Sequence, residues 1–223
     1  KDNGKFLVQL ERGETISCLS VIVCTGATAR WLGVEGEEKY RNHGVSACAT
    51  CDGFFYRGKE VAIIGGGNTA FEDALFLTNF CSKVYLIHRR SGFRADEVTI
   101  KKAKENKKIE FVIPAVVNKI IGDGVKLTGI EIKNVETGAL KTLDVSGVFV
   151  AIGSIPQTKF LIDSGIKLTE TGHIATDEKG HTNIEGLFSA GDCQDPIFRQ
   201  AIIAAGSGAK SAIEAINYVN KIK

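Results

Sequence analysis

A run of three glycines between an apolar strand and an amphipathic helix restricts the fold of this chain more than any other feature. The strand is predicted by Val61–Ile64, a short continuous apolar run typical of a strand covered on both faces. The turn spans Gly65–Ala70, and the following helix carries apolar residues on one stripe between Phe71 and Thr78. Val84–Ile87 then returns as a second strand, so the stretch predicts one complete βαβ unit.

Strand and helix patterns alternate through the rest of the chain. Strands are expected at residues 5–10, 19–24, 109–113 and 186–190, and another begins at Val145. A meander is expected over residues 116–143, and helices over residues 94–106 and 199–219. Residues 31–55, from Trp31 to Phe55, are expected to form a loop. This order predicts an α/β fold of the doubly wound, Rossmann-like type. Breaks at residues 26–30 and 153–157 favour a middle domain, with both ends of the chain joined in another.

Composition excludes several classes of protein. A net charge of +2 in 223 residues argues against a nucleic-acid-binding or membrane-surface protein, and no apolar run approaches the roughly 20 residues of a membrane span. Six cysteines are too few for a disulfide scaffold, so a cytoplasmic setting is expected. Because the sequence begins with a lysine, contains no methionine and opens on a hairpin, we expect it to be the later part of a longer protein.

The glycine turn fits the pattern G-x-G-x-x-A in the context that dinucleotide binding requires. Gly65 and Gly67 allow the tight turn and bring backbone N–H groups close to a pyrophosphate, whose charge the helix N-terminus favours. The alternative is a glycine-rich turn that holds no ligand. The position between a buried strand and a helix favours the dinucleotide site.

Basic residues follow the second strand of the unit and indicate which dinucleotide would bind. Sites for NAD place an acidic residue about 20 positions after the glycine motif, where it holds the ribose 2′-hydroxyl. This chain has His88-Arg89-Arg90 there, with Arg94 close behind. Guanidinium groups bind a 2′-phosphate through paired charged hydrogen bonds, so NADPH is favoured over NADH. The alternative is a solvated basic turn.

Cys48 and Cys51 form a C-x-x-C pair with Asp52 directly behind it. Tetrahedral zinc needs four ligands, and the other cysteines form no second pair, so no metal site is expected. A C-x-x-C pair can instead cycle between dithiol and disulfide, with one sulfur reacting as a thiolate. Asp52 is placed to carry the proton that such an exchange requires.

A flavin site is expected, because a hydride is not readily transferred directly from a nicotinamide to a disulfide and a flavin is the usual intermediate. Two strands that end in glycine turns supply parts of such a site: residues 21–27 end in Thr25-Gly26, and residues 186–193 contain Gly191-Asp192. Asp192 is placed for a ribose or ribityl hydroxyl. Arg199, Gln200 and Ala201 open the last helix, whose N-terminal dipole can stabilise negative charge on a flavin ring.

These motifs together resemble the low-molecular-weight thioredoxin reductases of bacteria, plants and fungi. The matching stretches are ACATCDGFF, IGGGNTA, HRRxxFRA, FVAIGxxPxT and AGDCxxxxxRQA, in the order and spacing of the family. The resemblance covers essentially the whole chain. It implies two Rossmann-like domains, with an NADPH domain (residues 29–153) inserted into an FAD domain (residues 1–28 and 154–223).

The resemblance also implies roles for individual residues. Cys51 would lie nearest the flavin, Cys48 would attack the disulfide of thioredoxin, and Asp52 would be the acid–base group. The residues implied for NADPH are Gly65, Gly67, Asn68, Thr69, Ala70, His88, Arg89, Arg90 and Arg94. The residues implied for FAD are Thr25, Gly26, Gly191, Asp192, Arg199, Gln200 and Ala201.

The chain departs from the family pattern at its start. The family begins with a further glycine-rich turn that binds the ADP half of FAD, and the sequence has no such turn, so its FAD domain is incomplete. The family implies thioredoxin as partner and a homodimer. Two alternatives stay open: the flavoprotein reductase of the alkyl hydroperoxide system, and a non-catalytic NADPH-binding fragment.

Overall fold

The computed structural model describes residues 4–222, which divide into two compact units. One unit combines the residues up to Thr28 with those from Ser154 onward, and the other is Ala29–Gly153. We refer to them as the split unit and the central unit. The assignment of FAD to the first and NADPH to the second stays a prediction.

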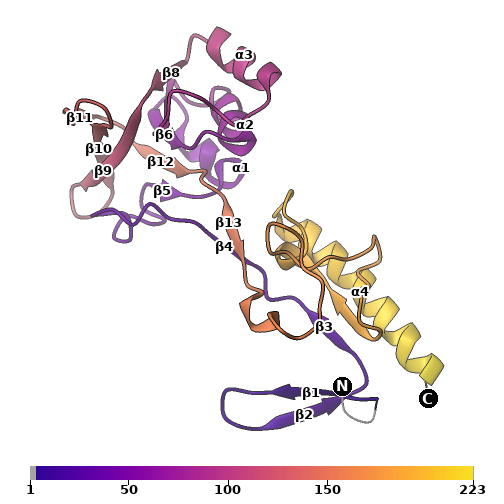
Figure 1. The fold of residues 1–223 in the computed structure, drawn as a ribbon. Coiled ribbons are helices and arrows are strands. Elements are labelled where there is room, and N and C mark those ends of the chain that lie inside the picture. The colour runs from indigo at the N-terminus through magenta and orange to yellow at the C-terminus, as the bar shows by residue number, and fades with distance from the viewer. Residues whose placement is uncertain (1–3, 223) are drawn as a thin grey trace. The chain divides into compact units, whose positions relative to one another are not determined.

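A five-stranded parallel sheet organises the central unit (Figure 1). Its strands, in spatial order, are β5 (Val45–Ser46), β12 (Gly147–Val150), β6 (Glu60–Ile64), β7 (Lys83–Ile87) and β8 (Ile109–Val112). The helical elements are α1 (Ala49–Asp52), η1 (Gly53–Tyr56), α2 (Asn68–Leu77) and α3 (Glu97–Glu105). The predicted βαβ unit is therefore confirmed as β6–α2–β7.

Strand β6 is buried on both faces, as its continuous apolar run predicts. Val61 and Ile63 lie in one hydrophobic cluster with Phe71 of α2, whereas Ala62 and Ile64 lie in a second cluster. This division follows from the alternation of side chains along a strand. The second cluster is shared with an antiparallel sheet of β9 (Ala115–Gly122), β10 (Leu127–Asn134) and β11 (Leu140–Leu143), which is the predicted meander.

The split unit contains shorter strands. Strands β1 (Phe6–Gln9) and β2 (Thr15–Cys18) form a hairpin, and β3 (Val21–Val23) pairs in parallel with β14 (Leu187–Ser189). The remaining elements are β13 (Ser154–Pro156), η2 (Lys159–Leu161), η3 (Gly191–Cys193) and α4 (Ala201–Ile222). Strand β13 pairs with β4 (Ala27–Ala29), whose last residue is the first of the central unit. Between residues 4 and 222, no helix has the length and apolar character needed to cross a bilayer.

Three local features differ from the expectation. The hairpin contains β2, which is not expected as a strand. Its residues Thr15, Ile16 and Ser17 are all exposed, so β2 lacks the buried apolar run that predicts a strand. The expected loop at 31–55 contains β5 and α1, which are too short to produce a periodic pattern. The last helix begins at Ala201, because Arg199 has a φ of 44° in the left-handed region and cannot belong to a right-handed helix.

Candidate active site

The glycine turn after β6 is shaped by close contacts that leave no room for side chains. A Cβ atom on Gly65 would lie 2.4 Å from the carbonyl oxygen of Ala151 and 2.6 Å from the Cβ of Ala70. A Cβ atom on Gly66 would lie 2.4 Å from the imidazole ring of His88. Gly67 differs, because nothing lies within 4 Å of its Cβ position. The turn is therefore packed on the protein side at the first two glycines and open at the third.

Helix α2 begins directly at this opening. Gly67 is its N-cap residue, with an extended backbone, and no side chain among residues 4–222 caps the helix. The first N–H groups of a helix have no partner within the helix and favour an anion. The turn thus offers the two features that a pyrophosphate needs, a close approach to the backbone and uncapped N–H groups. The residues present fit a nicotinamide dinucleotide.

Two hydrogen bonds connect the loop after β7 to the glycine turn. The N–H of Arg94 donates to the carbonyl oxygen of Gly66 at 2.8 Å, and the N–H of Asp96 donates to Oδ1 of Asn68 at 2.9 Å. The Asp96 side chain then caps α3 by accepting from the N–H of Thr99 at 2.8 Å. The loop after β7 (residues 88–96, the arginine loop) is therefore held at both the glycine turn and the next helix. Asn68 takes part as a hydrogen-bond acceptor inside the protein.

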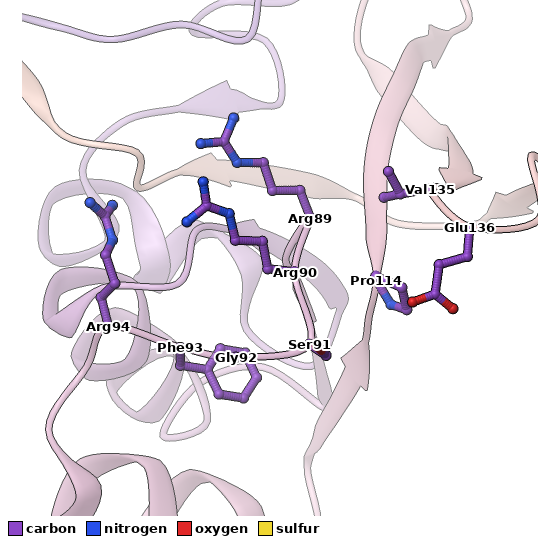
Figure 2. Close-up of a pocket in the computed structure, with 9 residues that line it drawn as sticks. All are labelled: Arg89, Arg90, Ser91, Gly92, Phe93, Arg94, Pro114, Val135 and Glu136. Carbon is purple, nitrogen blue, oxygen red and sulfur yellow. The ribbon is translucent and has the colours of Figure 1, made fainter.

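The loop after β7 forms one wall of an open pocket of about 560 Å³ (Figure 2). Its lining residues are Arg89, Arg90, Ser91, Gly92, Phe93, Arg94, Pro114, Val135 and Glu136. The three guanidinium groups form no ion pair with any residue between 4 and 222. An uncompensated cluster of three positive charges favours binding of an anion such as a phosphate.

His88 directly follows β7, and its imidazole ring lies against the glycine turn. Burial lowers the pKa of its imidazole, a hydrogen bond with the backbone of Gly92 partly opposes that effect, and the charges of Arg89, Arg90 and Arg94 lower the pKa further. The ring is therefore neutral at neutral pH. It packs under Gly66 and beside Phe93, with ring centroids 5.7 Å apart, so its observed role is to support the turn.

The C-x-x-C pair forms a disulfide, with the Cα atoms of Cys48 and Cys51 5.3 Å apart. Cys48 is the N-cap residue of α1, and the N–H of Cys51 donates to the Cys48 sulfur at 3.2 Å. Ser46, in β5, fixes the other side, because its hydroxyl accepts from the N–H of Cys48 at 3.0 Å. In the dithiol form, an N–H donor at this position would favour a thiolate on Cys48 over one on Cys51.

The segment after the disulfide places an acid and two exposed aromatic rings beside it. Asp52 is half-buried, and its N–H donates to the carbonyl oxygen of Cys48 at 3.2 Å. Phe54 and Phe55 follow in η1, with 60% and 72% of their surfaces exposed. Both rings belong to the motif ACATCDGFF, but the motif alone predicts no role for them.

The other four cysteines are free thiols in the structure: Cys18, Cys24, Cys81 and Cys193. Burial raises the pKa of Cys81 to about 11, which is typical of an inert thiol. In the part of the chain that the structure describes, no group of three His, Cys, Asp or Glu side chains could hold a metal ion.

The residues predicted for FAD in the split unit gather at the ends of two neighbouring strands. The N–H of Ala190 donates to the carbonyl oxygen of Val23 at 3.0 Å, so the turns after β3 and β14 lie side by side. Gly26 and Gly191 adopt φ values of 70° and 73° in these turns. The carboxyl ends of parallel strands are the usual place for a nucleotide, and four predicted residues meet here: Thr25, Gly26, Gly191 and Asp192.

Hydrogen bonds to neighbouring segments hold Thr25 and Gly191 in these turns. The Thr25 hydroxyl donates to the carbonyl oxygen of Gln157 at 2.7 Å, and the N–H of Gly191 donates to the Ser207 hydroxyl at 3.0 Å. Arg199 and Gln200 precede α4, and Ala201 is its first residue. The buried Nε2 atom of His173 has no hydrogen-bond partner between residues 4 and 222. That these turns bind FAD stays a prediction.

Comparison with known proteins identifies the family. Residues 1–208 match the family model described as pyridine nucleotide-disulphide oxidoreductase. The thioredoxin reductase of Rickettsia conorii is 44% identical over 219 residues, covering 97% of this chain and 70% of the relative. The chain belongs to the thioredoxin reductases. The resemblance read from the motifs is therefore confirmed, and the chain spans about 70% of the length of that relative.

Solved structures agree with this assignment. Thioredoxin reductase from Streptococcus pyogenes MGAS5005 aligns with a TM-score of 0.92 at 36% identity, covering 99% of this chain and 72% of that one. Thioredoxin reductase from Giardia duodenalis aligns with a TM-score of 0.88 at 40% identity, covering 94% and 69%. The predicted Rossmann-like α/β fold is confirmed. This thioredoxin reductase is a flavin-dependent disulfide oxidoreductase with flavin and nicotinamide cofactors.

Proposed function

We propose that this thioredoxin reductase takes electrons from NADPH through FAD to the Cys48–Cys51 disulfide and passes them to thioredoxin. The observation that carries the proposal is the composition of the central unit. One parallel sheet bears a glycine turn at a helix N-terminus, a pocket whose three arginines form no ion pair within residues 4–222, and a disulfide at a second helix N-terminus.

The choice of NADPH over NADH is supported by the charges of the pocket. Arg89, Arg90 and Arg94 line it, and the position after β7 has no carboxylate to hold a ribose 2′-hydroxyl. A 2′-phosphate would be held by these groups, and the pyrophosphate by Gly65, Gly67 and the N-terminus of α2, where Asn68, Thr69 and Ala70 lie.

FAD is supported by the paired turns of the split unit. Gly26 and Gly191 would let the flavin nucleotide approach the backbone, and Asp192 would accept from one of its hydroxyl groups. FAD, when bound, carries two electrons from the nicotinamide to the disulfide. Thr25, Arg199, Gln200 and Ala201 complete the proposed FAD set.

The disulfide gives the chain its exchange chemistry. Two electrons and two protons convert the bond between Cys48 and Cys51 to two thiols. The Cys48 thiolate, stabilised by the N–H of Cys51, then attacks a disulfide of the partner and forms a mixed disulfide, while the departing partner sulfur takes a proton. Cys51 attacks the Cys48 sulfur, which restores the internal disulfide and releases the reduced partner. Asp52 would carry the protons.

Thioredoxin as the partner is supported by the names of the relatives and by the surface around the disulfide. Phe54 and Phe55 expose large apolar rings a few residues from Cys51. Exposed aromatic side chains are enriched at protein interfaces and suit a protein disulfide better than a small one. A homodimer and a cytoplasmic location belong to the same proposal; four free thiols are expected of a reducing compartment.

The proposal is tested by absorbance spectroscopy of the purified chain with FAD, NADPH and thioredoxin. A flavin band that bleaches with NADPH and recovers with oxidised thioredoxin is the expected result. Cys48→Ser should keep the bleaching and lose the recovery, whereas Cys18→Ser, in the hairpin β1–β2 of the split unit, should keep both. Recovery in Cys48→Ser would refute the role of Cys48. A colourless protein that binds NADPH would support the alternative of a non-catalytic NADPH-binding fragment. Turnover with an alkyl-hydroperoxide-reducing partner in place of thioredoxin would support the alternative of a flavoprotein reductase of the alkyl hydroperoxide system.

A further inference from the structure

The arginine pocket has a second wall with a different chemistry. Pro114, Val135 and Glu136 line it, and Figure 2 shows Val135 and Glu136 on the side of the pocket away from Arg90 and Arg94. Glu136 is exposed and forms no ion pair within residues 4–222. A carboxylate is unexpected in a pocket for a phosphate, because the two negative charges repel each other.

The turn that carries Glu136 is fixed in place. Asn134 accepts hydrogen bonds through Oδ1 from the N–H groups of Glu136 and Thr137, both at 2.9 Å. The N–H of Val135 donates to the carbonyl oxygen of Pro114 at 3.0 Å, which joins the tip of the β10–β11 hairpin to the end of β8. Two hydrogen bonds therefore fix the shape of the turn that carries the carboxylate, and one holds that turn against Pro114 in the wall of the pocket.

The two walls together have the chemistry of an adenine nucleotide. The arginines suit the 2′-phosphate, and the apolar surfaces of Phe93, Pro114 and Val135 suit the faces of a base. Adenine carries an exocyclic amino group that donates hydrogen bonds, and carboxylates accept from such groups on bases. The volume of about 560 Å³ lies within the range of small-molecule pockets.

We propose that Glu136 reads the adenine base of the dinucleotide by accepting a hydrogen bond from its 6-amino group. The inference rests on the proposed use of NADPH and adds a specificity-determining residue to it. The charges of the two walls also fix the direction of binding, because the phosphate is attracted to the arginines and repelled from Glu136, while the amino group is attracted to Glu136.

The test replaces the amino group. In nicotinamide hypoxanthine dinucleotide phosphate the 6-amino group of NADP⁺ is a carbonyl oxygen, which accepts hydrogen bonds instead of donating them. Binding of both nucleotides to the 223-residue chain is measured by isothermal titration calorimetry. The unaltered chain should bind the hypoxanthine nucleotide about tenfold more weakly, because a charged hydrogen bond is lost and two acceptors face each other.

Glu136→Gln should bind the two nucleotides with about equal affinity, because an amide can accept from the amino group or donate to the carbonyl oxygen. Glu38→Gln, an exposed position of the central unit outside the pocket, should keep the tenfold preference. Equal affinities in the unaltered chain would overturn the proposal, as would a preference that survives in Glu136→Gln. A chain that binds neither nucleotide would refute the proposed NADPH site itself, which is a different failure.

Discussion

The Asn68 side chain and the Asp96 backbone are joined by a 2.9 Å hydrogen bond across 28 residues of sequence. The bond ties the first turn of α2 to the residue that caps α3, with the arginine loop between them. Asn68 belongs to the motif predicted to hold NADPH, and this contact gives it a second role as an anchor of the loop.

Asn68→Ala should therefore weaken NADPH binding about tenfold, because the loop that carries Arg94 loses one of its two attachments to the turn. Asn68→Ser should retain more of the affinity, because its neutral hydroxyl oxygen can still accept a hydrogen bond and adds no negative charge beside the pyrophosphate. Fluorescence titration with NADPH measures both. Equal losses in the two variants would indicate that the amide contacts the nucleotide itself.

Replacement of adjacent glycines should separate stability from binding. Gly66→Ala should lower the free energy of unfolding by about 1–3 kcal/mol, because the new methyl group would lie 2.4 Å from the His88 ring. Gly67→Ala should leave the free energy of unfolding nearly unchanged, because its Cβ position is open. The same change should weaken NADPH binding, because the new methyl group would block the close approach of the pyrophosphate to the backbone. Urea denaturation and NADPH titration of both variants check this. A stable Gly66→Ala protein would contradict the observed packing.

Arg94→Gln should lower the affinity for NADPH roughly tenfold to a hundredfold, because a charged hydrogen bond to the 2′-phosphate is lost. The affinity for NADH should not change, because NADH has no 2′-phosphate. The ratio of the two dissociation constants is the measurement. Arg57→Gln, an exposed position of the same unit, is the matched control. An equal effect on both nucleotides would place Arg94 away from the 2′-phosphate.

His173 should make the stability of the split unit depend on pH. Burial lowers the pKa of its imidazole below the ordinary 6.5, Arg199 lowers it further, and Asp195 and Asp192 partly oppose this. Between the folded and unfolded pKa values the unfolded chain binds more protons, so stability should fall as the pH drops below 6.5. Urea midpoints at about pH 7.5 and 5.5 measure the effect.

His173→Phe should flatten this pH dependence, whatever its effect on stability at neutral pH. His88 contributes in the same direction, since burial lowers its pKa as well, so a residual slope is expected. A slope identical to that of the unaltered chain would refute the contribution of His173.

Local pattern predicted the βαβ unit because a continuous apolar run, a glycine turn and a helical stripe are each short-range signals. The same reasoning could not find Glu136, which joins Arg90 in one pocket across 46 positions of unremarkable sequence. Likewise α1 has only four residues, and its Cys48 cap depends on a hydrogen bond that no periodicity reveals. The support of Gly66 by His88 needed the paired strands β6 and β7 to be known first.

The ends of the central unit meet. The N–H of Arg30, near its start, donates to the carbonyl oxygen of Gly153, its last residue, at 2.9 Å. A segment whose two ends touch can be cut from its host and closed by a short linker without stretching its backbone. Residues 29–153 therefore have the geometry of a transplantable cassette, which carries the predicted nucleotide pocket and the disulfide together.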